Sequence, residues 1–267
     1  MNLSKYAKNI TSQFGEDGII AEIIRVIGDE IPKYCVEFGA WDGKHLSNTW
    51  TLVNQQGWGG CYIEAERQRY LRLKQSYAIN HKVTAINAFV TDDSLPETSL
   101  KMLLKDAEVP VRIGVLSIDI DGNDYNIWRD LTDFEVDVVI IEYNYTIPPD
   151  VEYIDNGGRA NMGSSALSLT KLAHQKGYKL VACTIANCIY VRDELFPKFK
   201  LDDNSVATLM PRDGLTFLAR NFAGEVVFSS KTVVDPMIGF IGYRTMRKWA
   251  RLLIKRRKSF RYLGEEY

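Results

Sequence analysis

The stretch "VEFGAWDGKHLSNTW", residues 36–50, runs from an apolar segment through a turn with two glycines into a sequence of helical character. A strand, a glycine-containing turn and a helix in this order form the repeating unit of parallel α/β sheets. The turn also carries Glu37 and Asp42, whereas a turn that binds phosphate groups presents bare backbone amides. The stretch therefore predicts an α/β fold whose first turn binds something other than a pyrophosphate.

Strand-like and helical segments alternate along most of the chain. The predicted strands are residues 33–39, 60–66, 82–90, 112–120, 136–144, 178–184 and 188–193, and the predicted helices are residues 16–28, 46–57, 67–80, 97–108, 124–131 and 164–177. This alternation predicts a doubly wound, seven-stranded, mostly parallel sheet with helices on both faces. Ile185 to Asn187 separate the last two strands and are too short for a crossover helix, so we expect an antiparallel last strand.

The composition is that of a globular protein, with 46% hydrophobic and 25% charged residues. No window holds the roughly 18 apolar residues of a membrane span, and the N-terminus lacks the apolar core of a secretory signal. These features predict a soluble, cytoplasmic protein. The four cysteines fit no zinc or redox spacing, and we interpret them as reduced, mostly buried thiols.

The first turn is suited to a cationic ligand. Gly39 and Ala40 allow a ligand to approach the backbone closely. Glu37 and Asp42 would repel an anion and attract a positive charge. S-adenosylmethionine meets this demand, because its sulfonium and ammonium groups are positive while its carboxylate can reach backbone amides.

The ends of the next two predicted strands extend this hypothesis. An acid at the end of the second strand accepts hydrogen bonds from ribose hydroxyls in folds of this kind, and Glu64 stands at that place. After the third strand, Asn87 is placed to meet the edge of an adenine, with Ala88 and Phe89 beside the ring.

Six segments together resemble the class I S-adenosylmethionine-dependent methyltransferases, most closely their FkbM-like branch, over residues 11–192. The segments are "SQFGEDGII", "VEFGAWDGKHLSNT", "YIEAE", "NAFV", "VLSIDIDGNDYNIW" and "VVIIEYN". The resemblance implies a Rossmann-like methyltransferase fold that acts on a hydroxyl of a sugar or polysaccharide precursor. It also implies that Glu37, Gly39 and Asp42 line the methionine part of the cofactor, Glu64 the ribose, and Asn87 with Ala88 the adenine. Trp41 departs from the resemblance, because this position is commonly small.

The resemblance also implies a helix that closes over the cofactor at "SQFGED", which makes Gln13 and Asp17 candidate cofactor contacts. The same residues fit an ordinary helix start, with Ser12 as the cap and acids in the first turn. Residues 1–30 are therefore expected to form a capping helix region, residues 31–196 the methyltransferase domain and residues 197–267 a C-terminal extension.

Carboxylates gather at the ends of the fourth and fifth predicted strands. Asp119, Asp121 and Asp124 lie within six residues, and Glu142 and Asn144 follow the next strand. Their mutual repulsion costs stability unless a cation or a proton offsets it. One hypothesis is a Mg²⁺ site made of Asp119, Glu142 and Asn144, with Tyr143 interrupting the acid–amide pair. The other is a metal-free reaction in which Asp119 or Asp121 is the general base and the remaining polar groups, Asn144 among them, orient the acceptor; Asp119 would then also border the cofactor.

The end of the chain is basic and the rest is acidic. Residues 244–261 contain nine Lys or Arg and no acid, while the first 243 residues hold 24 basic and 32 acidic groups. Apolar residues recur at helical spacing in this basic segment, so it predicts an amphipathic helix that either docks on the core or makes peripheral contact with the inner face of a membrane. The acidic body disfavours nucleic acid as a partner.

Three functions are compatible with the sequence. The first is O-methylation of a saccharide hydroxyl with S-adenosylmethionine. The second keeps the cofactor and uses a small amine or phosphorylated metabolite as the acceptor. The third is a protein that binds the cofactor or a partner without turnover.

Overall fold

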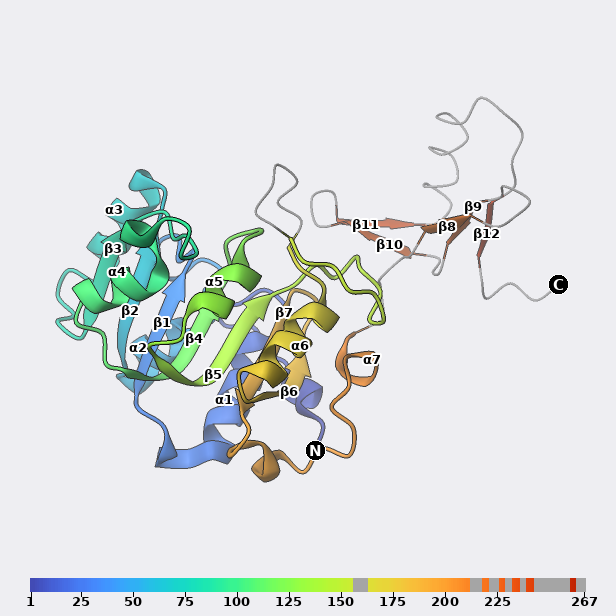
Figure 1. Ribbon diagram of the computed structural model, residues 1–267, viewed down its shortest axis with the longest axis horizontal. Helices are drawn as coiled ribbons and strands as arrows, with labels where there is room; N and C mark the ends of the chain where they lie inside the picture. Colours follow the sequence, from blue (N-terminus) through green and yellow to red (C-terminus); the bar gives the residue numbers. More distant parts are fainter. Residues whose placement is uncertain are drawn as a thin grey trace. The chain divides into compact units, whose positions relative to one another are not determined.

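The computed structural model describes residues 1–155, 163–211, 218–220, 226–228, 232–235, 239–242 and 260–262 (Figure 1). The chain divides into two units, Met1–Met210 and Pro211–Tyr267. The strands of the first unit are β1 (Tyr34–Phe38), β2 (Gly59–Glu64), β3 (Val83–Asn87), β4 (Arg112–Ile118), β5 (Glu135–Glu142), β6 (Tyr178–Cys183) and β7 (Asn187–Arg192). Its α-helices are α1 (Glu16–Ile27), α2 (Trp50–Gln56), α3 (Arg67–Ser76), α4 (Leu100–Asp106), α5 (Asp124–Asp130), α6 (Ala166–Gln175) and α7 (Val206–Leu209), and four short 3₁₀ helices lie at Leu3–Tyr6, Gly28–Glu30, Pro96–Thr98 and Phe196–Phe199.

The seven strands of the first unit form one sheet in the order β3-β2-β1-β4-β5-β7-β6. Strands β1 to β5 pair in parallel, and β7 lies antiparallel between β5 and β6. The predicted fold class is thus confirmed, including the antiparallel last strand. The chain reverses direction between β6 and β7 without a helix, which places β7 beside β5.

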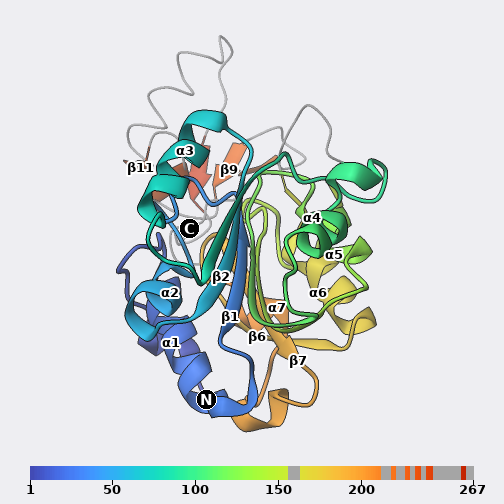
Figure 2. The ribbon, with the colours of Figure 1, turned by 90° about the vertical axis from the view of Figure 1, so that its left-hand side faces the viewer.

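Helices cover both faces of the sheet. Helices α1, α2 and α3 lie on one side, and α4, α5 and α6 lie on the other (Figure 2). The central strands are buried accordingly, and the apolar residues of β5 from Val136 to Ile141 are each less than 3% exposed. Asp137 within this strand is buried as well, and it pairs with the guanidinium of Arg112 at 2.8 Å.

Helix α2 begins four residues later than the sequence predicts. The pattern predicted a helix over residues 46–57, whereas the structure has it from Trp50 to Gln56. The side chains of Ser47 and Thr49 instead donate hydrogen bonds to Glu37 at the end of β1. The buried carboxylate therefore holds this segment in a non-helical conformation.

Strands β1 and β4 come unusually close where they end. Gly39 has a φ of 75°, and a Cβ atom at this position would lie 1.8 Å from the carbonyl oxygen of Asp119. β1 and β4 are also the neighbours at which the strand order reverses direction. In sheets of this type, ligands bind at that reversal, outside the carboxyl ends of the strands.

The second unit contains five short strands among its described residues. Strands β8 (Leu218–Arg220), β9 (Val226–Phe228) and β12 (Phe260–Tyr262) form one sheet, and β10 (Thr232–Asp235) pairs with β11 (Gly239–Gly242). A basic helix was predicted for residues 244–261, and residues 244–259 of it lie outside the described residues. Its last two residues belong to strand β12, so the prediction of a helix is wrong there.

In the part of the chain that the structure describes, we find no helix with the length and apolar character needed to cross a membrane.

We expect Gly39→Ala to destabilise the protein more than Gly57→Ala. Both glycines have a left-handed φ, so each alanine costs about 1–2 kcal/mol. Gly57 has open space around it, whereas a Cβ at Gly39 collides with backbone, which should add about 2 kcal/mol or more. Urea unfolding of both variants measures the difference, and equal losses would show that the close approach of β1 and β4 is not required.

Candidate functional site

A cavity of about 350 Å³ lies at the carboxyl ends of the parallel strands. Its walls come from the ends of β1, β2, β3, β4 and β5 and from the segment before α1. The lining residues are Gln13, Glu37, Gly39, Trp41, His45, Leu46, Ile63, Glu64, Ala65, Arg69, Ala88, Phe89, Val90, Asp119, Ile120, Asp121 and Glu142. A cavity of this size and place is typical of a site for a small molecule or cofactor.

Many of the predicted site residues meet in this cavity. The structure brings together Gln13, Glu37, Gly39, Glu64, Ala88, Asp119, Asp121 and Glu142. The remaining candidates, Asp17, Ala40, Asp42, Asn87 and Asn144, do not line it. Most of these five have polar contacts within the chain that explain their positions.

Glu37 borders the cavity, but its own chain satisfies its carboxylate. It accepts hydrogen bonds from Ser47 Oγ at 2.6 Å, from the backbone N–H of Asn48 at 3.0 Å and from Thr49 Oγ1 at 2.5 Å. Burial raises the pKa of Glu37, and these hydrogen bonds oppose the rise. Glu37 therefore orders the wall formed by residues 41–49 in addition to any contact with a ligand.

Glu64 ties the end of β2 to the first turn. Its carboxylate accepts from the backbone N–H of Trp41 at 2.8 Å and of Glu66 at 2.7 Å, and the residue is 5% exposed. Each carboxylate oxygen can accept a second hydrogen bond. Since Glu64 lines the cavity, the vacant acceptor positions can serve hydroxyl groups of a ligand.

Asp17 organises the segment before α1 and lies away from the cavity. Its Oδ2 accepts from the backbone N–H groups of Ile10, Thr11 and Ser12 at 2.7–2.8 Å, and Ser12 Oγ accepts from the N–H of Asp17. Asp17 is thus one of the acids in the first turn of α1, as the helix-start interpretation expects, but the N-cap residue is Gly15, so the prediction of Ser12 as the cap is wrong. Gln13, in the segment that Asp17 holds, does line the cavity.

Asp42, Asn87 and Asn144 make local contacts. Asp42 accepts from the backbone N–H groups of residues 44 and 45, and Asn87 donates to the carbonyl oxygens of residues 64 and 65. The side-chain oxygen of Asn144 accepts from the N–H and hydroxyl of Thr146. Ala40 is buried at 2% exposure.

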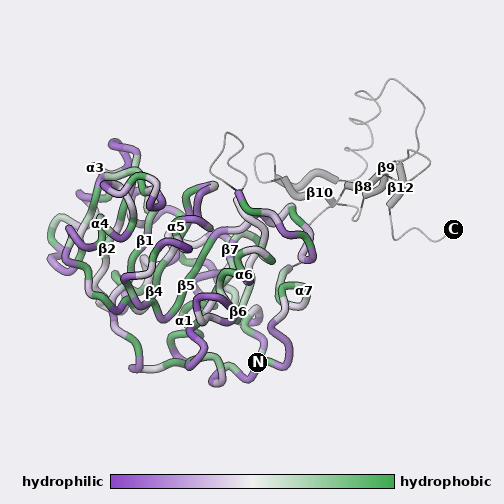
Figure 3. The backbone as a smooth tube through the Cα atoms, in the orientation of Figure 1, coloured by the Kyte–Doolittle hydropathy of each residue, from purple (hydrophilic) through white to green (hydrophobic). Residues whose placement is uncertain are grey.

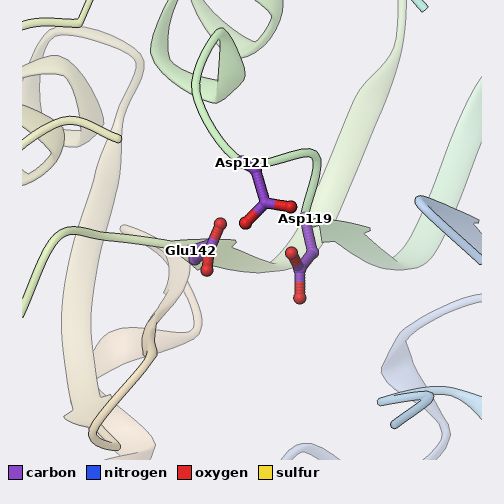
Figure 4. A group of neighbouring side chains, drawn as sticks. All are labelled: Asp119, Asp121 and Glu142. Atoms are coloured by element: carbon purple, nitrogen blue, oxygen red, sulfur yellow. The ribbon is translucent and has the colours of Figure 1, made fainter. Parts of the chain in front are cut away.

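Three carboxyl groups converge on one side of the cavity (Figure 4). Asp119 and Asp121 follow β4, Glu142 ends β5, and one oxygen from each lies within 4.8 Å of the others. Burial raises the pKa of both Asp119 and Glu142, and the neighbouring negative charges raise it further. Asp119 and Glu142 therefore titrate as a pair that retains a proton at a higher pH than ordinary carboxyl groups do.

A fourth acid, Asp124, shapes the turn that presents this group. It is 1% exposed and accepts from the backbone N–H groups of Ile120 at 3.0 Å and Gly122 at 2.9 Å. Asp121 lies inside the turn with a φ of 57°, which is a strained conformation for a non-glycine residue. The hydrogen bonds of Asp124 hold the strained residue in place.

One wall of the cavity is aromatic and cationic, and the sequence did not reveal this wall. The guanidinium of Arg69 lies 3.5 Å from the ring centre of Trp41, and the rings of Trp41 and His45 are 4.9 Å apart. Trp41 stood out in the sequence as a large residue in a turn, but nothing there pointed to Arg69. Only the fold brings the first turns of α3 over the β1 turn.

Comparison with known proteins gives matches among structures and none among sequences. No protein-family model matches the chain, and no curated protein matches it significantly. The N-terminal domain of EvdMO1, determined in the presence of SAH and D-fucose, is similar with 12% sequence identity and a TM-score of 0.42, over 66% of this chain and 82% of that chain. The METTL16 MTase domain is similar with 11% identity and a TM-score of 0.42, over 66% of each chain.

A third similar structure is the CMeT domain of the citrinin polyketide synthase, with 13% identity and a TM-score of 0.39, over 61% of this chain and 46% of that chain. The solved structures that resemble this chain thus include methyltransferase domains. At these identities and TM-scores the likeness says nothing about reaction or substrate, and membership of the FkbM-like branch stays a prediction.

We expect Glu142→Gln to stabilise the protein at neutral pH. The pKa of Glu142 is raised in the folded chain, so the folded state binds more protons than the unfolded state and loses stability as pH rises above about 4. An amide has no charge to bury, so the gain should be about 1 kcal/mol at pH 7 and vanish near pH 4. Urea unfolding at both pH values, with a chelator present, measures the difference. A variant less stable than the parent at pH 7 would contradict the interpretation that burial and neighbouring charges make the ionised form of Glu142 costly.

Proposed function

We propose that this protein is an S-adenosylmethionine-dependent methyltransferase. The observation that carries the proposal is the charge of the cavity at the reversal of strand order. Five carboxyl groups line it, from Glu37, Glu64, Asp119, Asp121 and Glu142, against the guanidinium of Arg69 and the imidazole of His45. Such a lining favours a ligand with a positive centre over a dinucleotide with a pyrophosphate.

The lining residues fit the parts of this cofactor. Glu64 has acceptor positions left for two neighbouring ribose hydroxyls, and Ala88 and Phe89 lie after β3, where an adenine would rest. Gly39 gives close access to the backbone at the end of β1. When bound, the cofactor supplies an electrophilic methyl group on a positively charged sulfur.

For the acceptor we propose a hydroxyl group of a sugar or polysaccharide precursor. The cavity offers several polar groups that can hold hydroxyls, Gln13, Asp121 and Glu142 among them. Asp119 would take the proton from the reacting oxygen. Its raised pKa makes it a stronger base than an ordinary carboxylate, with a pKa closer to neutral pH.

A divalent cation is the second candidate for activating the acceptor. Asp119, Asp121 and Glu142 offer hard oxygen ligands close enough together to share one ion, which is the ligand type that Mg²⁺ prefers. Asp121 thereby takes the place that the sequence suggested for Asn144. An ion there would lower the pKa of an acceptor hydroxyl, while the three carboxylates would lose their repulsion.

An amine acceptor is also compatible with the site. The three converging carboxyl groups would attract an ammonium ion as readily as they would orient a hydroxyl. A third candidate is a protein that binds the cofactor without turnover. Experiment distinguishes it from methylation of a hydroxyl or an amine, because it requires cofactor binding without methyl transfer.

We expect Glu64→Gln to weaken binding of S-adenosylhomocysteine roughly 10- to 100-fold, because a charged acceptor of ribose hydroxyls is lost. Calorimetry on the parent and the variant measures this. Glu135→Gln is the matched control, since Glu135 begins β5 at the opposite edge of the sheet and is exposed; it should bind as the parent does. If the parent binds neither S-adenosylmethionine nor its demethylated product but does bind a nicotinamide nucleotide, the proposal is wrong.

We expect Asp119→Asn to abolish transfer of a labelled methyl group to saccharide acceptors while the variant still binds the cofactor. Under the metal-free mechanism, the parent keeps its activity in excess chelator. Loss of activity in chelator followed by recovery with Mg²⁺ would establish the second candidate instead. Binding of the cofactor without methylation of hydroxyl or amine acceptors would identify a protein without turnover.

A further inference from the structure

We propose that the outer face of α3 and the loop after it form a docking surface for an anionic lipid bilayer. The α3 surface consists of Arg67, Leu71, Arg72, Lys74 and Ile79, all exposed. It consists of residues of the first unit alone and does not depend on the proposed reaction.

The charge of α3 contrasts with that of the rest of the chain. Its ten residues include four cations and no acid, within a stretch of 243 residues in which acids outnumber bases by 32 to 24. Arg69 pairs with Glu66 at 2.7 Å. Within the described residues, no ion pair is seen for Arg67, Arg72 or Lys74. Figure 3 shows α3 largely in the colour of hydrophilic residues.

Aliphatic side chains lie exposed among these cations. Leu71 is 46% exposed, and it stands one helical turn from both Arg67 and Lys74. Ile79, in the loop after α3, is 91% exposed. Cations that attract anionic headgroups, together with apolar side chains that enter the interface, are the combination that binds a peripheral protein to a bilayer.

The aliphatic residues favour a bilayer over an anionic polymer. A nucleic acid or an acidic polysaccharide would be held by the cations through release of counterions. Binding of single-stranded nucleic acid also uses flat aromatic side chains on which bases stack, and Leu71 and Ile79 offer none. Of these occupants, an anionic bilayer is the one that both attracts the cations and buries the aliphatic side chains.

The helix that carries the α3 surface also borders the candidate site. Helix α3 follows directly on β2, whose last residue is Glu64, and Arg69 from its first turns lines the cavity. Phe89, which also lines the cavity, is 71% exposed. Docking through α3 would therefore hold the cavity close to the bilayer surface.

Vesicle co-sedimentation of the full chain tests the proposal. The vesicles are phosphatidylcholine with phosphatidylglycerol, and phosphatidylcholine alone as the neutral reference. The triple variant Arg67→Gln, Arg72→Gln, Lys74→Gln should partition roughly 100-fold less onto the anionic vesicles, because each cation near such a surface contributes about fivefold. The double variant Leu71→Ser, Ile79→Ser keeps every charge and should partition roughly tenfold less.

The control removes three cations that stand in ion pairs on the other face of the sheet. Lys101→Gln, Lys105→Gln and Lys171→Gln change residues of α4 and α6, and this variant should bind vesicles as the parent does. All variants keep residues 244–261, so a contribution from that segment is the same in each. Calorimetry with S-adenosylhomocysteine should give the parent's result for the aliphatic variant, which keeps the two proposals separate.

Three results would overturn the inference. The parent could fail to bind anionic vesicles, or the α3 variants could bind as well as the parent, or the α4/α6 control could lose as much binding as the cation variant. A different pattern would assign the surface to an anionic polymer instead. In that pattern the parent binds heparin but no vesicles, the cation variant loses heparin binding, and the Leu71/Ile79 variant keeps it.

Discussion

The structure of the loops at the carboxyl ends of the strands depends on how the negative charges of buried carboxylates are offset. A buried carboxylate without hydrogen bonds is costly enough that it either takes up a proton or recruits donors. Asp17, Glu37 and Asp124 each recruit backbone N–H or hydroxyl groups from a nearby segment. In doing so, they fix the segment before α1, the wall after β1 and the turn after β4. The three acids therefore build the cavity from loops that would otherwise have no regular structure.

Asp119, Asp121 and Glu142 are compensated differently. Instead of organising a loop, their carboxyl groups lie close together on one side of the cavity, where burial and mutual repulsion raise the pKa of Asp119 and Glu142. This arrangement costs stability, which a proton, a cation or a ligand can relieve. Because apolar residues in place of such acids would cost less stability, the presence of three acids at one point favours a chemical role.

Much of the fold could be predicted from the sequence, because alternating apolar strands and amphipathic helices leave few arrangements of the chain. The site was predictable in part, since acids at the ends of successive parallel strands must meet at one edge. The sequence could not show which of those acids already accept hydrogen bonds from their own chain. The side-chain donors to Glu37 come from Ser47 and Thr49, ten and twelve residues later, and they also displace the start of α2. Arg69 was missed because its contact with Trp41 exists only after α3 packs over the first turn.

The same hydrogen bonds link the walls of the cavity to one another. Thr11 Oγ1, in the segment that Asp17 holds, donates to the carbonyl oxygen of Ser47 at 3.0 Å, and Ser47 in turn donates to Glu37. Glu16 at the start of α1 accepts from Thr184, beyond β6, at 2.6 Å. The segment before α1 is thus fixed to both halves of the sheet. A ligand that displaced Gln13 would have to break contacts on both sides, so the structure favours a site that is largely formed before its ligand binds.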